Sequence, residues 1–127
     1  MVLQQVLPDA RPAAGPVVTK AVVRAAERLR LSARALATVI GVSEATVSRM
    51  RHGAFSLAPA TKPFELAVLV VRLFRSLDAI TGGDETVAAA WLGNDNTVLG
   101  GRPVELIQTI PGLIDVIAYL DARRALV

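Results

Sequence analysis

A short helical pattern, a single glycine and a second short helical pattern constrain the first half of the chain most strongly. Ser32 precedes an apolar-periodic stretch over 33–40, and Ser43 precedes another over 44–51. A serine oxygen at such a position accepts a hydrogen bond from the free N–H groups of a helix's first turn. Gly41, between the two stretches, is the residue type that most easily adopts the left-handed conformation that ends a helix. The pattern therefore predicts a helix-turn-helix unit.

The outward face of the predicted 44–51 helix carries side chains suited to DNA. Arg49 is the expected base reader, because a guanidinium group can donate two hydrogen bonds to guanine. Glu44 is repelled by phosphates, although its carboxylate can accept a hydrogen bond from cytosine. The residues expected to reach base edges are Glu44, Ala45, Ser48 and Arg49, and those expected to bind phosphates are Ser43, Thr46 and Arg51. Similar units also occur in proteins that never touch DNA, and that alternative stays open.

Charge is distributed unevenly between the two halves of the chain. Residues 1–60 contain eight basic and three acidic side chains, whereas residues 61–127 contain six basic and eight acidic ones. A basic surface confined to one half favours a polyanionic partner for that half.

The segment from about residue 18 to 56, which includes the sequence GVSEATVSRMRHG, resembles the Xre/Cro-type regulators.

Apolar spacing predicts further helices on both sides of this unit. One is expected over 17–30, after a loosely structured lead over 1–16 that contains three prolines. Another is expected over 64–80, and it is apolar nearly all round. Such a helix forms either the centre of the core alone or, through the spare face near Val68 and Val71, also a homodimer seam.

The stretch WLGNDNTVLGGRPVEL, residues 91–106, predicts a shaped corner. Asparagine and aspartate form turns, the diglycine permits positive φ, and proline begins a new helix expected over 103–109. A last helix is expected to begin at Pro111 and Gly112. The corner is interpreted as a hinge made by Trp91, Leu99, Gly100, Gly101 and Pro103. Two other interpretations of this stretch are a docking surface and a glycine loop that cradles phosphate in an enzyme.

Composition excludes several kinds of site. The chain has no cysteine and one histidine, which excludes disulfides, thiol nucleophiles and cysteine-ligated zinc, and no metal or cofactor is predicted. Its longest uncharged apolar run falls far short of the roughly 18 residues that span a bilayer, so we expect a cytoplasmic protein without membrane contact. Apolar residues make up 53% of the chain, which favours a partner or an oligomer that covers apolar surface.

The second half resembles a known toxin-binding domain. The order WL, Asn96, LGGRP, EL, Gly112, Val116 and Leu120 resembles the Xre/MbcA/ParS antitoxin C-terminal domain over about residues 64–127. In that family the domain follows a helix-turn-helix and binds a RES-domain toxin that degrades NAD, within a type II toxin–antitoxin system. The resemblance implies a non-enzymatic antitoxin that obstructs the toxin's NAD cleft with its last helix and tail, and that represses its own operon by binding operator DNA.

These observations predict an all-α chain, with a helix-turn-helix domain over 17–60 and a dimerisation and toxin-binding domain over 61–127. A homodimer is expected because DNA-binding helices of this kind usually act as symmetric pairs, and a larger toxin–antitoxin assembly is also allowed. The residues expected to face the toxin are Tyr119, Asp121, Arg123 and Arg124, with Asn96 and Arg102 at the edge. The alternative function is a stand-alone helix-turn-helix transcriptional regulator whose C-terminal half senses a ligand or partner.

Overall fold

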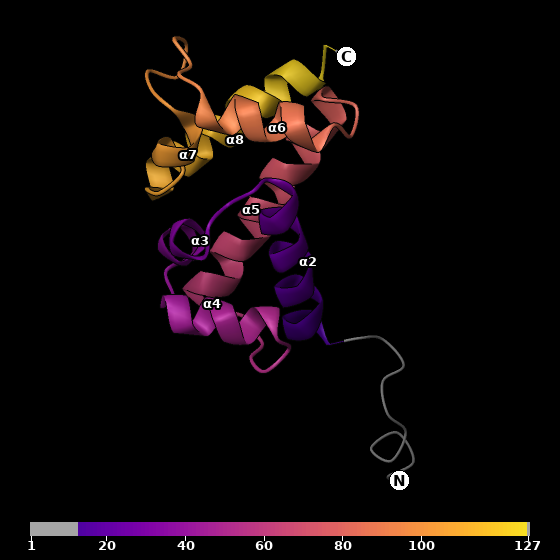
Figure 1. Ribbon diagram of the computed structural model, residues 1–127, viewed down its shortest axis with the longest axis vertical. Helices are drawn as coiled ribbons and strands as arrows, with labels where there is room; N and C mark the ends of the chain where they lie inside the picture. The colour runs from indigo at the N-terminus through magenta and orange to yellow at the C-terminus, as the bar shows by residue number, and fades with distance from the viewer. Residues whose placement is uncertain (1–12, 127) are drawn as a thin grey trace, which may run out of the picture.

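The computed structural model describes residues 13–126, and the described chain is all-helical. Its seven helices follow one another without a named strand in this range (Figure 1). None of them is both long and apolar enough to cross a membrane. The helices are α2 (Ala14–Arg28), α3 (Ala33–Ile40), α4 (Glu44–Arg51), α5 (Lys62–Ile80), α6 (Glu85–Gly93), α7 (Pro103–Leu106) and α8 (Ile110–Arg124).

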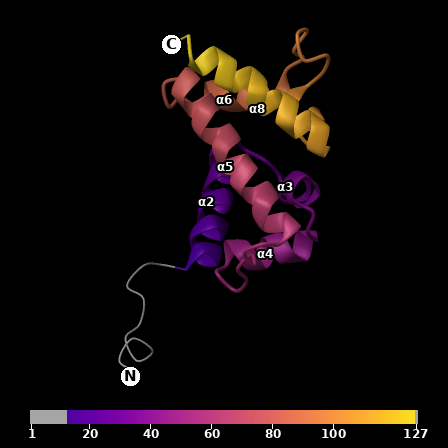
Figure 2. The same cartoon turned by 180° about the vertical axis from the view of Figure 1, so that it is seen from behind.

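Helix α5 lies at the centre of the fold and packs against α2, α3, α6 and α8. Figures 1 and 2 show α2, α3 and α4 around one end of α5, and α6, α7 and α8 around the other. Its 19 residues bury apolar side chains along nearly the whole length, from Leu66 through Val70 and Leu73 to Leu77. Ala67 is also fully buried, whereas Val68 stays 43% exposed. Val71 is half-buried, so the face near Val68 and Val71 that the sequence left spare is at least partly exposed in the folded chain.

The predicted helix-turn-helix is confirmed in its details. Ser32 Oγ accepts a hydrogen bond from the backbone N–H of Ala35 at 3.0 Å, and Ser43 Oγ accepts one from Thr46 at 3.0 Å. Gly41 has a φ of 78°, in the left-handed region. The serine caps and the glycine turn therefore fix the angle between α3 and α4.

The first helix begins earlier than predicted. It covers Ala14–Arg28 rather than 17–30, so the expectation of a loose lead was wrong for residues 14–16, and residues 1–12 lie outside the described range. Pro16 fits within the first turn, because the N–H groups there have no partner inside the helix. Gly15 is buried, and a Cβ atom on it would lie 2.6 Å from the carbonyl oxygen of Leu57. Because Gly15 has no side chain, the first turn of α2 can pack against the backbone of Leu57.

The chain between α6 and α8 also differs from the prediction. Helix α7 is a single turn, Pro103–Leu106, rather than a helix over 103–109. Thr109 then caps α8 by accepting a hydrogen bond from the backbone N–H of Gly112 at 3.1 Å. A Cβ atom on Gly112 would lie 1.9 Å from the carbonyl oxygen of Leu106, so glycine permits the tight approach of α7 to α8.

A polar cluster holds the C-terminal part of α8 against α5. Ser76 Oγ, fully buried on α5, donates a hydrogen bond to Asp121 Oδ1 at 2.9 Å, and the Arg72 guanidinium forms an ion pair with Asp121 Oδ2. The hydrogen bond from Ser76, followed by the contacts with Arg72, lowers the pKa of Asp121 and outweighs the opposing effect of its partial burial. Asp121 therefore anchors α8 in its ionised form.

Gly112→Ala is predicted to destabilise the fold, although alanine normally favours a helix over glycine by about 1 kcal/mol. The added methyl group cannot fit beside Leu106 without moving α7 or α8, and such overpacking costs about 1–3 kcal/mol. Urea unfolding followed by circular dichroism would measure the change. Gly93→Ala in α6 is the matched control, since a Cβ there meets nothing within 4 Å. Equal stability of the two variants would contradict this account of Gly112.

Asp121→Asn is predicted to remove part of the pH dependence of stability. Because the pKa of Asp121 is lower in the folded chain than its ordinary value of 3.8, its contribution is complete above that value and is lost as pH falls through the folded pKa. The variant should lose about 0.5–1 kcal/mol near neutral pH and differ less from wild type in acid. Urea unfolding at several pH values measures this, with the exposed Asp115→Asn as control. A constant difference at all pH values would contradict the anchor.

Candidate functional site

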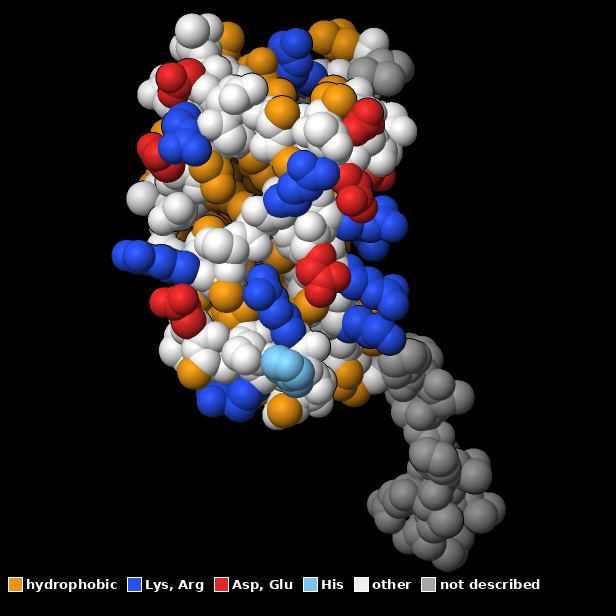
Figure 3. Space-filling model, in the orientation of Figure 1, with side chains coloured by type: hydrophobic (Ala, Val, Ile, Leu, Met, Phe, Trp, Pro, Cys, Tyr) orange, Lys and Arg blue, Asp and Glu red, His pale blue; other side chains and the backbone are white. Residues whose placement is uncertain are grey.

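The outer surface of α4 presents the residues predicted to bind DNA. Six of the seven predicted residues are exposed, namely Ser43, Glu44, Ala45, Ser48, Arg49 and Arg51, and Thr46 is half-buried. Basic side chains predominate over acidic ones on the part of the surface formed by α2, α3 and α4 (Figure 3). The arrangement leaves a positive, accessible helix face that a major groove could accommodate.

Arg49 is held in place by two neighbours. Its Nη2 donates a hydrogen bond to Thr46 Oγ1 at 3.0 Å, and its guanidinium carbon lies 6.0 Å from the centre of the Phe55 ring. Thr46 Oγ1 also accepts a hydrogen bond from Ser43 Oγ at 2.9 Å. Ser43 and Thr46, predicted to bind phosphates, thus help to order the helix start and the arginine. The sequence analysis did not single out Phe55, although an aromatic residue just after α4, the helix predicted to contact bases, was a visible signal.

A basic hollow lies between α2 and α4. It has a volume of about 440 Å³, and its charged lining residues are Lys20, Arg24 and Arg51 with one acid, Glu27. Arg51 was predicted to bind phosphate, but Lys20 and Arg24 were not singled out because they belong to a different helix. Only the packing of α2 beside the end of α4 brings these three cations together. The hollow widens the positive surface around the predicted reading helix.

The corner between α6 and α7 is closed by Asn96. Its backbone oxygen accepts hydrogen bonds from the N–H groups of Gly100 at 2.9 Å and Gly101 at 3.2 Å, and its side-chain oxygen accepts one from Leu99 at 3.0 Å. Both glycine N–H groups are therefore used within the turn. A phosphate cradle would need such groups to be free, so the turn argues against the phosphate-loop interpretation.

Arg102 holds the other side of the same corner. Its Nε donates a hydrogen bond to the carbonyl oxygen of Gly93 at 2.7 Å, and its Nη1 lies 2.8 Å from Glu105 Oε1. Pro103 is buried beside it. Asn96 and Arg102, predicted at the edge of the toxin interface, thus form the hinge together with the predicted Leu99, Gly100, Gly101 and Pro103. A toxin contact at Asn96 or Arg102 stays a prediction.

Trp91 connects α6 to α8 rather than forming the corner itself. Its ring stacks on that of Tyr119, with centroids 6.1 Å apart and an angle of 22° between the planes. The indole N–H makes no hydrogen bond to another part of the described chain. Arg123 continues the stack, because its guanidinium carbon lies 5.2 Å from the Tyr119 ring centre and its Nη1 donates to the Tyr119 hydroxyl at 2.9 Å.

The last turns of α8 contain one side chain that anchors the helix to α5 and two that are exposed at its end. Asp121 faces α5, where Ser76 and Arg72 bind it, so its predicted contact with a toxin stays untested. Arg123 and Arg124 are exposed at the helix end. No group of side chains suited to bind a metal ion occurs within residues 13–126. The end of α8 presents a stack of Trp91, Tyr119 and Arg123 on a helix that Asp121 anchors. Such a surface suits protein binding.

Comparison with known families agrees with both resemblances. Residues 9–72 match the antitoxin Xre-like helix-turn-helix domain, and residues 76–125 match the antitoxin Xre/MbcA/ParS C-terminal toxin-binding domain. A comparison with curated protein sequences found no significant match. The first match extends into α5, beyond the limit of about residue 56 expected from the sequence, and the second begins later than expected. Neither family is enzymatic. The chain therefore belongs to the Xre antitoxins, with a helix-turn-helix domain followed by a toxin-binding domain.

Proposed function

We propose that this antitoxin neutralises a RES-domain toxin that degrades NAD, by inserting the end of α8 into the toxin's active-site cleft. The observation that carries the proposal is the exposed end of a helix whose position is fixed from two sides. Ser76 and Arg72 hold Asp121 against α5, while Trp91 supports Tyr119. Arg123, exposed just beyond this anchor, is already oriented before binding, which lowers the entropy cost of complex formation.

The chemistry of the tail suits a nucleotide-binding cleft. Arg123 and Arg124 are both exposed, and arginine binds carboxylates through two parallel hydrogen bonds. Many dinucleotide sites carry a carboxylate that binds a ribose hydroxyl. Arginines from the antitoxin would occupy such a carboxylate and fill the space that NAD needs. Competition for the cleft is then sufficient for neutralisation, without any chemical step by the antitoxin.

The same chain is proposed to repress its own operon as a homodimer, alone or in a larger toxin–antitoxin assembly. Arg49 on α4 is the proposed base reader, with Glu44, Ala45 and Ser48 beside it, and Arg51 is the proposed phosphate contact. Proteins of this kind read two half-sites about one helical turn apart, one with each copy. The alignment of Arg49 by Thr46 and Phe55 supports a direct role in base readout.

Arg49→Ala is expected to reduce the preference for the operator over unrelated DNA by about 10- to 100-fold, because one bidentate base contact contributes about 1–3 kcal/mol of discrimination. Arg51→Ala is expected to weaken binding to all sequences alike and to lower the salt dependence by about one counterion. Gel shifts at several salt concentrations distinguish the two effects. Lys62→Ala, an exposed cation at the start of α5, is the control. Unchanged discrimination in Arg49→Ala would mean that α4 does not read the bases.

Removal of residues 123–127 is expected to release toxin activity while operator binding persists. The truncation keeps Asp121, so the anchor to Ser76 and Arg72 stays intact and the fold should survive. Cells that express the toxin with the full chain should keep their NAD and grow, whereas cells with the truncated chain should lose NAD. Arg34→Ala, an exposed arginine on α3, serves as the control. Full rescue by the truncated chain would overturn the proposed role of the tail.

A further inference from the structure

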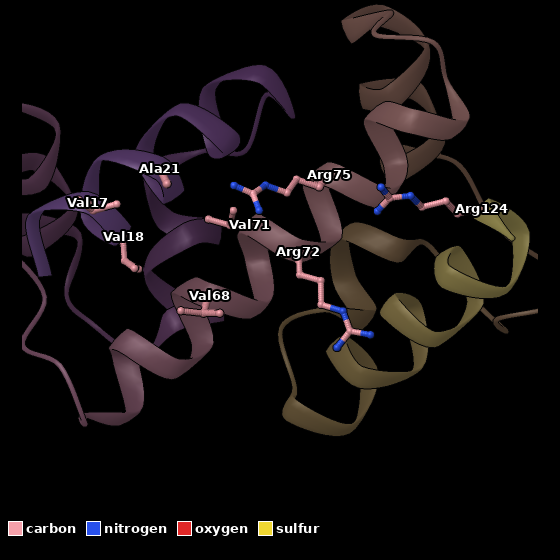
Figure 4. A pocket seen from close by; sticks show the side chains of 8 residues that line it. All are labelled: Val17, Val18, Ala21, Val68, Val71, Arg72, Arg75 and Arg124. Carbon is pink, nitrogen blue, oxygen red and sulfur yellow. The ribbon is translucent and has the colours of Figure 1, made fainter. Parts of the chain in front are cut away.

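An open groove lies between α2 and α5, away from α4. It has a volume of about 450 Å³, and Figure 4 shows its lining side chains. Val17 and Val68, on opposite walls, remain 48% and 43% exposed. The apolar part of the lining comes from Val17, Val18 and Ala21 on α2 and from Val68 and Val71 on α5. The fold thus leaves apolar surface uncovered where its two main helices meet.

The charged rim of this groove is entirely basic. Arg72, Arg75 and Arg124 are the charged residues of the lining. Arg72 turns towards α8, where Asp121 pairs with it, whereas Arg75 extends towards α2 (Figure 4). Neither Arg75 nor Arg124 forms an ion pair with another residue of the described chain. Two guanidinium groups therefore remain available beside an apolar floor.

We propose that this groove is a second contact surface for the toxin, and that it receives an apolar toxin segment that carries carboxylates. The proposal rests on the toxin-binding role proposed above and extends it from the end of α8 to α5 and α2. Apolar side chains of the segment would cover Val17 and Val68, and its carboxylates would meet Arg75 and Arg124. Such pairs gain specificity from charge complementarity across the interface.

Charge complementarity disfavours a second copy of this chain as the occupant. In a two-fold symmetric interface the same surface meets itself. Arg75 and Arg124 from both copies would then gather in one small contact, and no carboxylate lines the groove to pair with them. The homodimer seam predicted near Val68 and Val71 therefore becomes the competing outcome of the test.

The position of Arg124 connects the groove to the proposed cleft-binding tail. Arg124 belongs to the last turn of α8, next to Arg123, yet it also lines the groove. A toxin that receives the end of α8 in its cleft would lie directly beside α5. Because α2 belongs to the helix-turn-helix part and α8 to the toxin-binding part, an occupant of the groove would contact both.

Site-specific photo-crosslinking identifies the occupant directly. A benzophenone amino acid replaces Val68 in the full chain, which is then mixed with a purified, catalytically inactive form of the RES-domain toxin proposed above. We expect an antitoxin–toxin adduct by mass spectrometry, with the crosslinked toxin peptide containing aspartate or glutamate. An adduct of two antitoxin chains, or a toxin peptide without acidic residues, would overturn the proposal.

Charge reversal tests the same surface without a crosslinker. Arg75→Glu is expected to weaken toxin binding at least tenfold by calorimetry, and the loss should shrink at high salt. Lys62→Glu makes the same charge change at the other end of α5 and should leave toxin affinity unchanged. Equal affinities of wild type and Arg75→Glu would reject the groove while the antitoxin function stands. A wild-type chain that fails to bind the toxin would instead reject the proposed function itself.

Discussion

Both halves of this molecule depend on the burial of one helix. Leu66, Val70, Leu73 and Leu77 of α5 are buried, and the helix contacts α2 and α3 as well as α6 and α8. The buried residues of both halves form one core cluster, so the DNA-binding half and the toxin-binding half differ in their surfaces and share a core. The match of the helix-turn-helix family through residue 72 agrees with this, since it includes the whole first half of α5.

Local signals in the sequence predicted much of the fold, because they act within a few residues. Serine caps, the left-handed Gly41 and the apolar period of α5 each determine their own element, and they placed α3 and α4 correctly. The start of α2 was missed because Gly15 is explained by its contact with Leu57, far along the chain. The predicted second turn of α7 failed for a similar reason, since Gly112 brings α8 close to Leu106.

The candidate sites were predictable as residue types but not as arrangements. The predicted residues on α4 are exposed as expected, since an amphipathic helix shows its polar face in the sequence. Asp121, Asn96 and Arg102 were expected to face the toxin, yet the structure gives each a hydrogen bond that holds α8 or the corner. Phe55 lies only six residues after Arg49 and was a local signal that the sequence analysis did not use. The meeting of α2 with α5, in contrast, depends on packing between distant segments and leaves no local pattern.

The shared helix α5 also has a consequence for how long the antitoxin persists in a cell. Opening of either half would remove the support of the other, so the two halves should open together. A protease that cuts opened chains would then end DNA binding and toxin neutralisation at the same time. A ligand held by either surface would protect both activities from degradation, because it lowers the fraction of opened chain. Repression of the operon and neutralisation of the toxin would therefore be lost at the same rate, which is the rate at which the antitoxin is degraded.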